Sequence, residues 1–351
     1  MKILMLTDGL RSGGKERQLV EIIEHINDQF EIGVISYNTN EFYTDLVKEK
    51  VKYYAEIDKT KSKILPFFST FNHIRLFKPD IIHTWDSLSS FYSYYSSMLF
   101  KIPFVEGSIR DAGIEKGWQR KLKLFFINRA DTVLANSIAG LNAYGVKGKV
   151  IYNAINIHRF LNPVDNNQNN MIMVANFSDY KDQKTFLLAG IELINKKIID
   201  KIYLLGDGKN RQKYIDWITE DFEDIRKKII FTGSVPDVEN YLSQCKFGVL
   251  CSTPYYSEGL SNSVLEYLGA GLIPIVTDIG GSSEIIEDRV NGFLIPAESP
   301  DEIVSIVEKL SKNNQLVEQI KINAKATIEN KFNHNAVVNQ LENLYQELVN
   351  V

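Results

Sequence analysis

Two glutamates in the stretch SEGLSNSVLEYLGAG could act as a pair, because only seven residues separate Glu258 from Glu266. Paired carboxylates serve in acid–base chemistry or hold the hydroxyl groups of a ligand. A helix is predicted to start near Asn262, so Glu258 stands in the loop before it and Glu266 inside it. Ser263 and Glu266 also fit the capping box S-x-x-E, in which the glutamate only bonds the backbone at the helix start. Both interpretations of Glu266 stay open at this point.

The start of the same helix is a candidate anion site. Unpaired N–H groups and the helix dipole favour phosphate at a helix N-terminus, and serine and asparagine surround this one. Lys181, in the loop ANFSDYKDQ after another apolar run, could meet a phosphate as a point charge. A lysine in a loop is more often only solvated, so a solvated side chain is the favoured interpretation of Lys181 taken alone.

A glycine-rich loop, DGLRSGGKERQL, follows the first apolar run of the chain. Gly13 and Gly14 lead into an expected helix, where glycines let backbone N–H groups approach an anion. The loop does not match the dinucleotide fingerprint G-x-G-x-x-G. Taken alone, it favours a tight turn over a ligand site.

Twelve short apolar runs are the elements that must position these residues. They are apolar on both faces and are separated by segments of helical period such as KERQLVEIIEHI, a pattern that predicts parallel sheets covered by helices on both sides. The sequence therefore predicts two doubly wound α/β domains of six strands each. The expected strands are KILMLT, EIGVIS, DIIHT, IPFV, DTVLAN and KVIYN in the first half and MIMVAN, KIYLLG, KIIFTG, FGVLCS, LIPIVT and NGFLIP in the second.

The domain boundary is predicted in FLNPVDNNQNNM, where Pro163 and a run of asparagines interrupt the pattern. We expect an N-terminal domain over residues 1–163 and a C-terminal domain over 171–330. Apolar residues at helical spacing predict a helix over 331–351 that packs on a domain.

Composition excludes several classes of protein. With 351 residues, 44% of them hydrophobic, the chain can form two globular cores. A net charge of −4 argues against a nucleic-acid-binding protein. Cys245 and Cys251 are too few for a disulfide framework and lack zinc-site spacing. No run of about 18 apolar residues could span a membrane, and no D-x-D motif is present to hold a divalent metal.

The stretch EGLSNSVLE resembles the E-x7-E motif of retaining glycosyltransferases of the GT-B fold, including the family 4-like bacterial enzymes that build polysaccharides and lipid-linked glycans. GGKERQL, ANFSDYKD, LLGDG, FTGSVPDV and GGSSEIIEDRVNGFLIP resemble other motifs of that family, in the correct order over nearly the whole chain. The resemblance implies an α/β architecture of two Rossmann-like domains facing each other across a cleft. It also implies that the C-terminal helix returns to the N-terminal domain.

The resemblance also implies roles for individual residues. Glu258 would hydrogen-bond the donor sugar, Glu266 would hold the ribose hydroxyls, and Lys181 would neutralise the charge on the departing diphosphate. The catalytic set is Glu258, Lys181 and Arg110; the donor-binding set is Gly14, Asn176, Gly206, Arg211, Gly259, Leu260, Ser261, Asn262 and Glu266; and the acceptor-binding set is Gly13, His83 and Arg110.

Two departures from the family pattern affect these assignments. Many relatives have an arginine where this chain has Asn176, and Arg211 is not the matching residue. Many also have a histidine after the strand IPFV, where this chain has Arg110, whose guanidinium fork can bind a phosphate. His83 could contact the acceptor, or it could be an ordinary strand-end side chain.

The leading hypothesis is a retaining glycosyltransferase that moves a hexose or N-acetylhexosamine from a nucleotide sugar, expected to be UDP-linked, to a glycan or polyprenyl-linked acceptor. A sugar-nucleotide epimerase and a catalytically silent GT-B binding subunit are the alternatives. We expect no cofactor and no metal requirement, no nucleic-acid partner, and a cytoplasmic location at the inner face of the membrane. Cations among aromatic residues in 114–129 suggest a peripheral membrane contact, although a helix with solvated lysines fits that pattern too.

Overall fold

The computed structural model describes residues 1–113, 116–160, 168–255 and 258–349. The chain divides into two compact units. Unit 1 comprises Met1–Ala154 together with the C-terminal segment that starts at His334, and unit 2 comprises Ile155–Asn333. In the described part of the chain no helix is long and apolar enough to cross a membrane.

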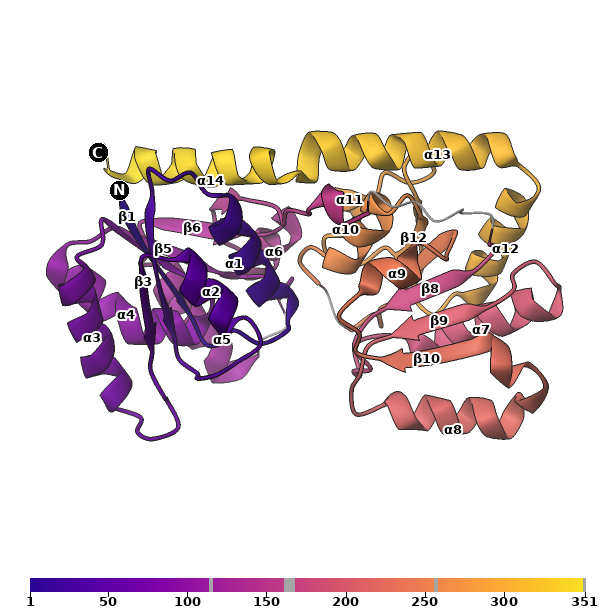
Figure 1. Cartoon of the computed structure of the whole chain (residues 1–351), viewed down its shortest axis with the longest axis horizontal. Coiled ribbons are helices and arrows are strands. Elements are labelled where there is room, and N and C mark those ends of the chain that lie inside the picture. Colours follow the sequence, from indigo (N-terminus) through magenta and orange to yellow (C-terminus); the bar gives the residue numbers. More distant parts are fainter. Residues whose placement is uncertain (114–115, 161–167, 256–257, 350–351) are drawn as a thin grey trace. The chain divides into compact units, whose positions relative to one another are not determined.

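A parallel seven-stranded sheet forms the centre of unit 1, in the order β3-β2-β1-β4-β5-β6-β7 (Figure 1). All six runs predicted in this half form strands. The seventh, β3, was not predicted, because it lies at the sheet edge and its tyrosines are only half buried, so it lacks a continuous apolar run. The strands are β1 (Lys2–Thr7), β2 (Glu31–Ser36), β3 (Tyr53–Glu56), β4 (Ile81–Thr84), β5 (Phe104–Ile109), β6 (Thr132–Ala135) and β7 (Lys149–Val150).

Helices cover both faces of this sheet because side chains alternate along each strand. Ile3 and Met5 of β1 face one helical layer, and Leu4 and Leu6 face the other. The first layer includes Leu341, Leu344 and Tyr345 of the C-terminal helix, so this helix packs on the N-terminal half, as expected. The helices of unit 1 are α1 (Gly14–His25), α2 (Thr44–Lys50), α3 (Leu65–Phe77), α4 (Ser87–Phe100), α5 (Gly117–Ile127), α6 (Ile138–Tyr144) and α14 (His334–Val349).

Unit 2 contains a second parallel sheet of six strands, in the order β10-β9-β8-β11-β12-β13 (Figure 1). All six predicted runs form its strands: β8 (Met171–Val174), β9 (Ile202–Leu205), β10 (Ile229–Gly233), β11 (Phe247–Leu250), β12 (Ile273–Thr277) and β13 (Phe293–Ile295). Its α-helices are α7 (Gln183–Asn195), α8 (Arg211–Asp221), α9 (Val238–Leu242), α10 (Asn262–Gly269), α11 (Ser282–Ile285), α12 (Pro300–Ser311) and α13 (Asn314–Thr327).

The chain enters unit 2 earlier than the predicted boundary. Ile155 donates its backbone N–H to the carbonyl of Phe332 at 3.0 Å, and both residues belong to unit 2. A Cβ on Gly269 would lie 3.3 Å from the ring of Phe160, so the segment Ile157–Phe160 also packs against unit 2. The junction is therefore at 154/155, and Pro163, on which the prediction depended, lies outside the described residues.

Candidate functional site

Lys181 and Glu258 meet at the carboxyl edge of the sheet in unit 2. The Nζ of Lys181 lies 2.6 Å from the Oε1 of Glu258. Lys181 follows β8 and Glu258 follows β11, and these strands are neighbours in the sheet, so their loops leave it side by side. The Lys181 side chain is 10% exposed and that of Glu258 is 28% exposed, so solvent reaches the carboxylate more readily than the ammonium.

Backbone hydrogen bonds hold the Lys181 loop against the loop after β11. The N–H of Asp182 donates to the carbonyl of Cys251, and the N–H of Thr253 donates to the carbonyl of Tyr180, both at 3.0 Å. The Asp182 carboxylate then caps helix α7 by accepting from the N–H of Thr185. Lys181 thus stands on backbone that is fixed on both sides, unlike a lysine in a solvated loop.

Two glycines after β12 bring a third loop to Glu258. Gly280 has a φ of +61°, and a Cβ at this position would collide with the carbonyl oxygen of Glu258. The N–H of Gly281 donates to the same oxygen at 3.1 Å. The backbone of Glu258 therefore depends on a close approach that only glycine permits, and Gly280 is a candidate site residue that was not predicted from the sequence.

Helix α10 begins at Asn262, where it was predicted to start, with Ser261 as its N-cap. The capping-box interpretation of Glu266 is wrong, because the hydroxyl of Ser263 instead donates to the carbonyl of Val174 at 2.7 Å. Glu266 lies well inside the helix and is only 4% exposed. Gly259 and Leu260 are buried in the bend between Glu258 and the helix. Because only three residues separate Glu258 from Asn262, the first turn of α10 starts close to Glu258 at the carboxyl edge.

The remaining donor-site residues in unit 2 occupy the loops after β8 and β9. Asn176 is exposed. Gly206 has a φ of +130°, and a Cβ there would collide with the carbonyl of Ala175, so this glycine has a packing reason independent of any ligand. Arg211 begins α8 and donates from a terminal guanidinium nitrogen to the carbonyl of Phe231 at 3.2 Å, which directs it toward the end of β10.

In unit 1 the predicted glycine loop ends in a charged cluster. Gly13 is the N-cap of α1 and Gly14 its first residue. Lys15 pairs with Asp8, which follows β1, and its Nζ lies 3.1 Å from Asp86, which follows β4. Arg11 also contacts Asp8, at 2.8 Å. Lys15 was not predicted as a site residue, although its place directly after two glycines at a helix start is a signal that the sequence contains.

Electrostatics fix the charge states of this cluster. Burial opposes the charge on Lys15, but attraction to Asp86 and Asp8 outweighs it and raises the pKa of Lys15. Burial would raise the pKa of Asp8, yet attraction to Lys15 and Arg11 lowers it. Because both groups stay charged at neutral pH, the start of α1 holds a fixed pattern of opposite charges near Gly13.

The side chain of His83 does not lie at the open strand end where an acceptor contact was predicted. His83 is 1% exposed, and its Nδ1 lies 2.6 Å from the hydroxyl of Tyr345 on α14. Two residues along β4 from Ile81, it lies on the same face of the strand, so its ring points into the layer under α14 and not out of the strand end. Burial, with a smaller contribution from Arg110, lowers the pKa of His83 to about 3, so the ring is neutral at physiological pH.

Arg110 lies at the end of β5 with its guanidinium carbon 4.1 Å from the ring centre of Trp85. Its Nε donates to the carbonyl of Gly107 at 3.2 Å. Arg110 and His83 also line a cavity of about 20 Å³, enough for about one water molecule. Burial lowers the pKa of Arg110 to about 10, which still leaves it charged at neutral pH.

The segment predicted to touch a membrane, 114–129, forms helix α5 and its flanks, and residues 114–115 of it lie outside the described part. Lys123, one of the cations expected to face the lipid, is buried, and its Nζ lies 3.0 Å from Asp111. Arg120 donates to the carbonyl of Ala143 at 2.7 Å. Two cations of the segment therefore bind other residues of unit 1, whereas the side chain of Trp118 is 71% exposed.

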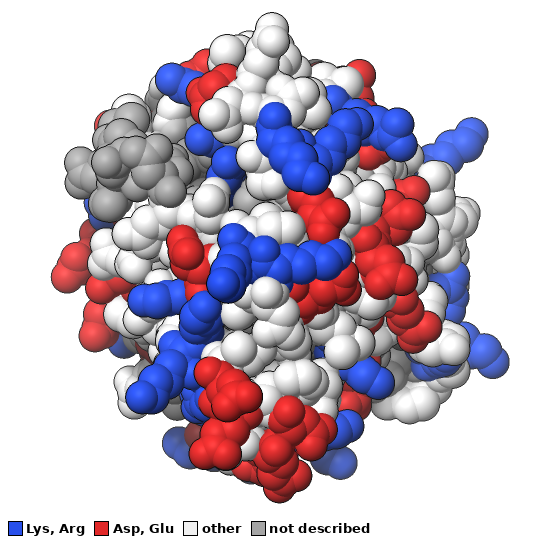
Figure 2. Space-filling model, turned by 90° about the vertical axis from the view of Figure 1, so that its right-hand side faces the viewer, with Lys and Arg blue, Asp and Glu red and all other residues white. Residues whose placement is uncertain are grey.

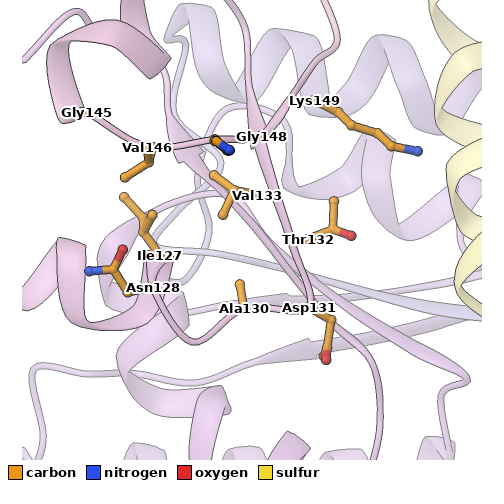
Figure 3. A pocket seen from close by; sticks show the side chains of 11 residues that line it. Ile127, Asn128, Ala130, Asp131, Thr132, Val133, Gly145, Val146, Gly148 and Lys149 are labelled. Atoms are coloured by element: carbon orange, nitrogen blue, oxygen red, sulfur yellow. The ribbon is translucent and has the colours of Figure 1, made fainter.

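Unit 1 also has a hollow of about 510 Å³ (Figure 3), but it lies at the edge of the sheet opposite to the one where a ligand site is expected. Thr132 and Lys149, which open β6 and β7, line it, so it sits at the amino ends of the strands. Ligands of doubly wound folds bind at the carboxyl ends.

On the face shown in Figure 2, Lys and Arg side chains are mixed with Asp and Glu and form no extended field of one sign.

Comparisons with known proteins agree with this architecture. Residues 12–159 match the family described as Glycosyltransferase Family 4, and residues 155–327 match Glycosyl transferases group 1. The chain is 22% identical over 377 residues to the UDP-Gal:alpha-D-GlcNAc-diphosphoundecaprenol alpha-1,3-galactosyltransferase of Escherichia coli, a match that covers 97% of this chain and 95% of that protein. A match to an uncharacterized glycosyltransferase of Methanocaldococcus jannaschii, 28% identical over 193 residues, covers 52% of this chain and 46% of the other.

The fold also matches a solved structure over nearly its full length. The crystal structure of Anabaena HepE in complex with UDP and glucose has a TM-score of 0.84 and 19% identity, and covers 99% of both chains. At this identity the likeness shows the fold alone. Combined with the two family matches, it identifies the chain as a glycosyltransferase of the GT-B fold, similar to the group 1 and family 4 enzymes.

Proposed function

We propose that the chain transfers a hexose or N-acetylhexosamine from a UDP-linked donor to a lipid-linked glycan, with retention at the anomeric carbon. The observation that carries this proposal is the pairing of Lys181 with Glu258 beside the first turn of α10, at the carboxyl edge of the sheet in unit 2. A cation, a helix N-terminus and a carboxylate at one edge suit a diphosphate joined to a sugar.

Each group would act on a different part of the donor. Lys181 would neutralise the charge that grows on the departing diphosphate, which backbone N–H groups from Leu260 to Asn262 would also contact. Glu258, the more exposed partner, would accept hydrogen bonds from the sugar hydroxyls. Glu266, inside α10, would hold the ribose hydroxyls. Asn176, Gly206 and Arg211 remain proposed donor contacts, although the last two also have structural partners within unit 2.

Retention is proposed to proceed on one face of the sugar, with the leaving phosphate taking the acceptor proton. Glu258 forms an ion pair with Lys181, which suits a carboxylate that binds hydroxyls and is not the nucleophile. A trapped covalent glycosyl adduct on Glu258 would contradict this mechanism. We also propose that turnover needs no metal, because Lys181 and the helix start supply the positive field. A strict loss of activity with chelator, at an unchanged melting temperature, would overturn this point.

The acceptor is proposed to bind through unit 1, with Gly13, Lys15 and Arg110 at its carboxyl edge. The Escherichia coli relative is named for a diphosphoundecaprenol-linked acceptor, which supports a polyprenyl-linked glycan for this chain. A diphosphate on the acceptor side would suit the cations Lys15 and Arg110.

A peripheral membrane contact through 116–129 is also proposed, since Trp118 is 71% exposed. Co-sedimentation with vesicles containing anionic lipid should weaken for Trp118→Ser. Equal binding by the variant and the wild type would contradict this contact.

A donor panel tests the proposed function. Purified protein is incubated with UDP-, GDP- and ADP-sugars, and the released nucleotide and the anomeric configuration of the first sugar product are followed by NMR. We expect release from a UDP-sugar with retention. Conversion of the donor into another nucleotide sugar would indicate an epimerase, and no binding or turnover of any donor would indicate a silent subunit.

A further inference from the structure

Three metal-ligand side chains meet where the C-terminal helix joins unit 1. Glu21 and His25 lie one turn apart near the end of α1, and His334 is the first residue of α14. One ligand atom from each residue lies within 4.8 Å of the other two. The rings of His25 and His334 stack with centres 3.8 Å apart and an angle of 24° between them. We propose that Glu21, His25 and His334 bind one transition-metal ion of the zinc type.

Two buried atoms in this cluster lack the hydrogen bonds that such atoms normally make. The Nε2 of His334 and the Oε2 of Glu21 lie 2.8 Å apart, and both residues are 8% exposed. Among the described residues neither atom has a hydrogen-bond partner of acceptable geometry. Buried polar atoms without partners are rare in folded proteins and call for an explanation. A shared ion would satisfy both atoms at once.

The third ligand already has the tautomer that a metal-binding histidine needs. The Nδ1 of His25 lies 2.8 Å from the backbone carbonyl of Glu21, so it carries the proton and leaves the lone pair on Nε2. Metal-bound histidines commonly donate their other ring N–H to a carbonyl in this way. Because His25 is exposed, an ion can enter from solvent and keep a water molecule in its fourth position.

The ligand set decides the class of ion. Two imidazoles with one carboxylate suit zinc, nickel or copper, whereas calcium and magnesium prefer oxygen ligands alone. His334 is the point at which the chain returns to unit 1. The ion would therefore fasten the start of α14 to α1, in addition to the apolar contacts of Leu341 and Leu344 farther along that helix. This role is structural and does not depend on the proposed transfer reaction.

The test uses the full chain, without a polyhistidine tag, freed of metal by a chelator that is then removed. Zn²⁺ is titrated calorimetrically, and Co²⁺ is added in parallel because its visible spectrum reports the coordination geometry of the bound ion. We expect one equivalent of either ion to bind and Zn²⁺ to raise the melting temperature. His25→Asn should weaken binding by at least about tenfold and abolish the cobalt spectrum.

Two further variants keep the test decisive. Glu21→Gln preserves the shape of the side chain and should weaken binding as well. His158→Asn replaces an exposed histidine of unit 2 and should bind like the wild type. His334 is buried, so replacing it risks unfolding the chain, and it is left unchanged. The absence of saturable binding by the wild type, or wild-type affinity in His25→Asn, would overturn the proposal.

Discussion

Lys181 and Glu258 neutralise each other in the structure, with 2.6 Å between Nζ and Oε1. An incoming diphosphate must therefore compete with Glu258 for the lysine. Partly exposed ion pairs contribute up to about 1 kcal/mol, or about fivefold in affinity. Glu258→Gln should raise the affinity for UDP by about two- to fivefold, while donor turnover falls by about 100-fold or more through loss of the sugar contact. Calorimetry with UDP and a nucleotide-release assay measure the two effects, and a tenfold loss of UDP affinity would contradict the competition.

The glycines after β12 allow a test of how Glu258 is positioned. Gly280→Ala places a Cβ against the carbonyl of Glu258, at a φ of +61°. We expect a sharp drop in donor turnover together with a loss of stability. Gly271→Ala is the matched control, because Gly271 has a φ of +74° but its Cβ would meet nothing within 4 Å. The control should lose only about 1–2 kcal/mol of unfolding free energy to backbone strain, as measured by urea denaturation, and should keep its activity. Equal turnover in the two variants would rule out positioning by Gly280.

Glu266→Gln separates a ligand role from a structural one. The substitution keeps the size of the buried side chain and removes its charge. If Glu266 holds the ribose hydroxyls, the affinity for both UDP and uridine should fall by about tenfold, because hydrogen bonds to a charged group contribute about 1.5–3 kcal/mol. The melting temperature should stay close to that of the wild type. A lowered melting temperature with unchanged nucleotide affinity would return Glu266 to a structural role.

The buried imidazole of His83 should make stability depend on pH. Its folded pKa of about 3 lies below the value of 6.5 for a free histidine, so the unfolded chain takes up the proton first. The contribution of His83 is therefore fully present above pH 6.5 and declines as pH falls toward 3, by about 1.4 kcal/mol per pH unit. His83→Gln should show a shallower loss of unfolding free energy than the wild type between pH 6.5 and 4. Identical slopes would show that His83 is not held neutral.

Strands and their order along the chain were predictable because strands buried on both faces read as continuous apolar runs. The edge strand β3 was not, since half-buried tyrosines do not form such a run. The junction at 154/155 was not predicted, because Ile155 joins unit 2 through a backbone pairing with Asn333, which is far away in the sequence.

The placement of two candidate site residues was predictable from the strands that their loops follow. Glu258 and Lys181 could be placed at a common edge because parallel strands end on the same side. What the sequence could not show is which way a side chain turns. His83 points under α14, Lys123 is buried against Asp111, and Lys15 stands between Asp8 and Asp86, each through contacts with distant residues.

The most direct measurement of the central claim is the rate of UDP release from a UDP-sugar in the wild type, Lys181→Ala and Lys209→Ala. Lys209 is a matched control, because it is a lysine of unit 2 paired with a carboxylate, Asp179, but is exposed. We predict that Lys181→Ala lowers the rate by about 100- to 1000-fold and that Lys209→Ala changes it less than twofold. Wild-type turnover in Lys181→Ala would contradict the assignment of the Lys181–Glu258 pair as the reaction centre.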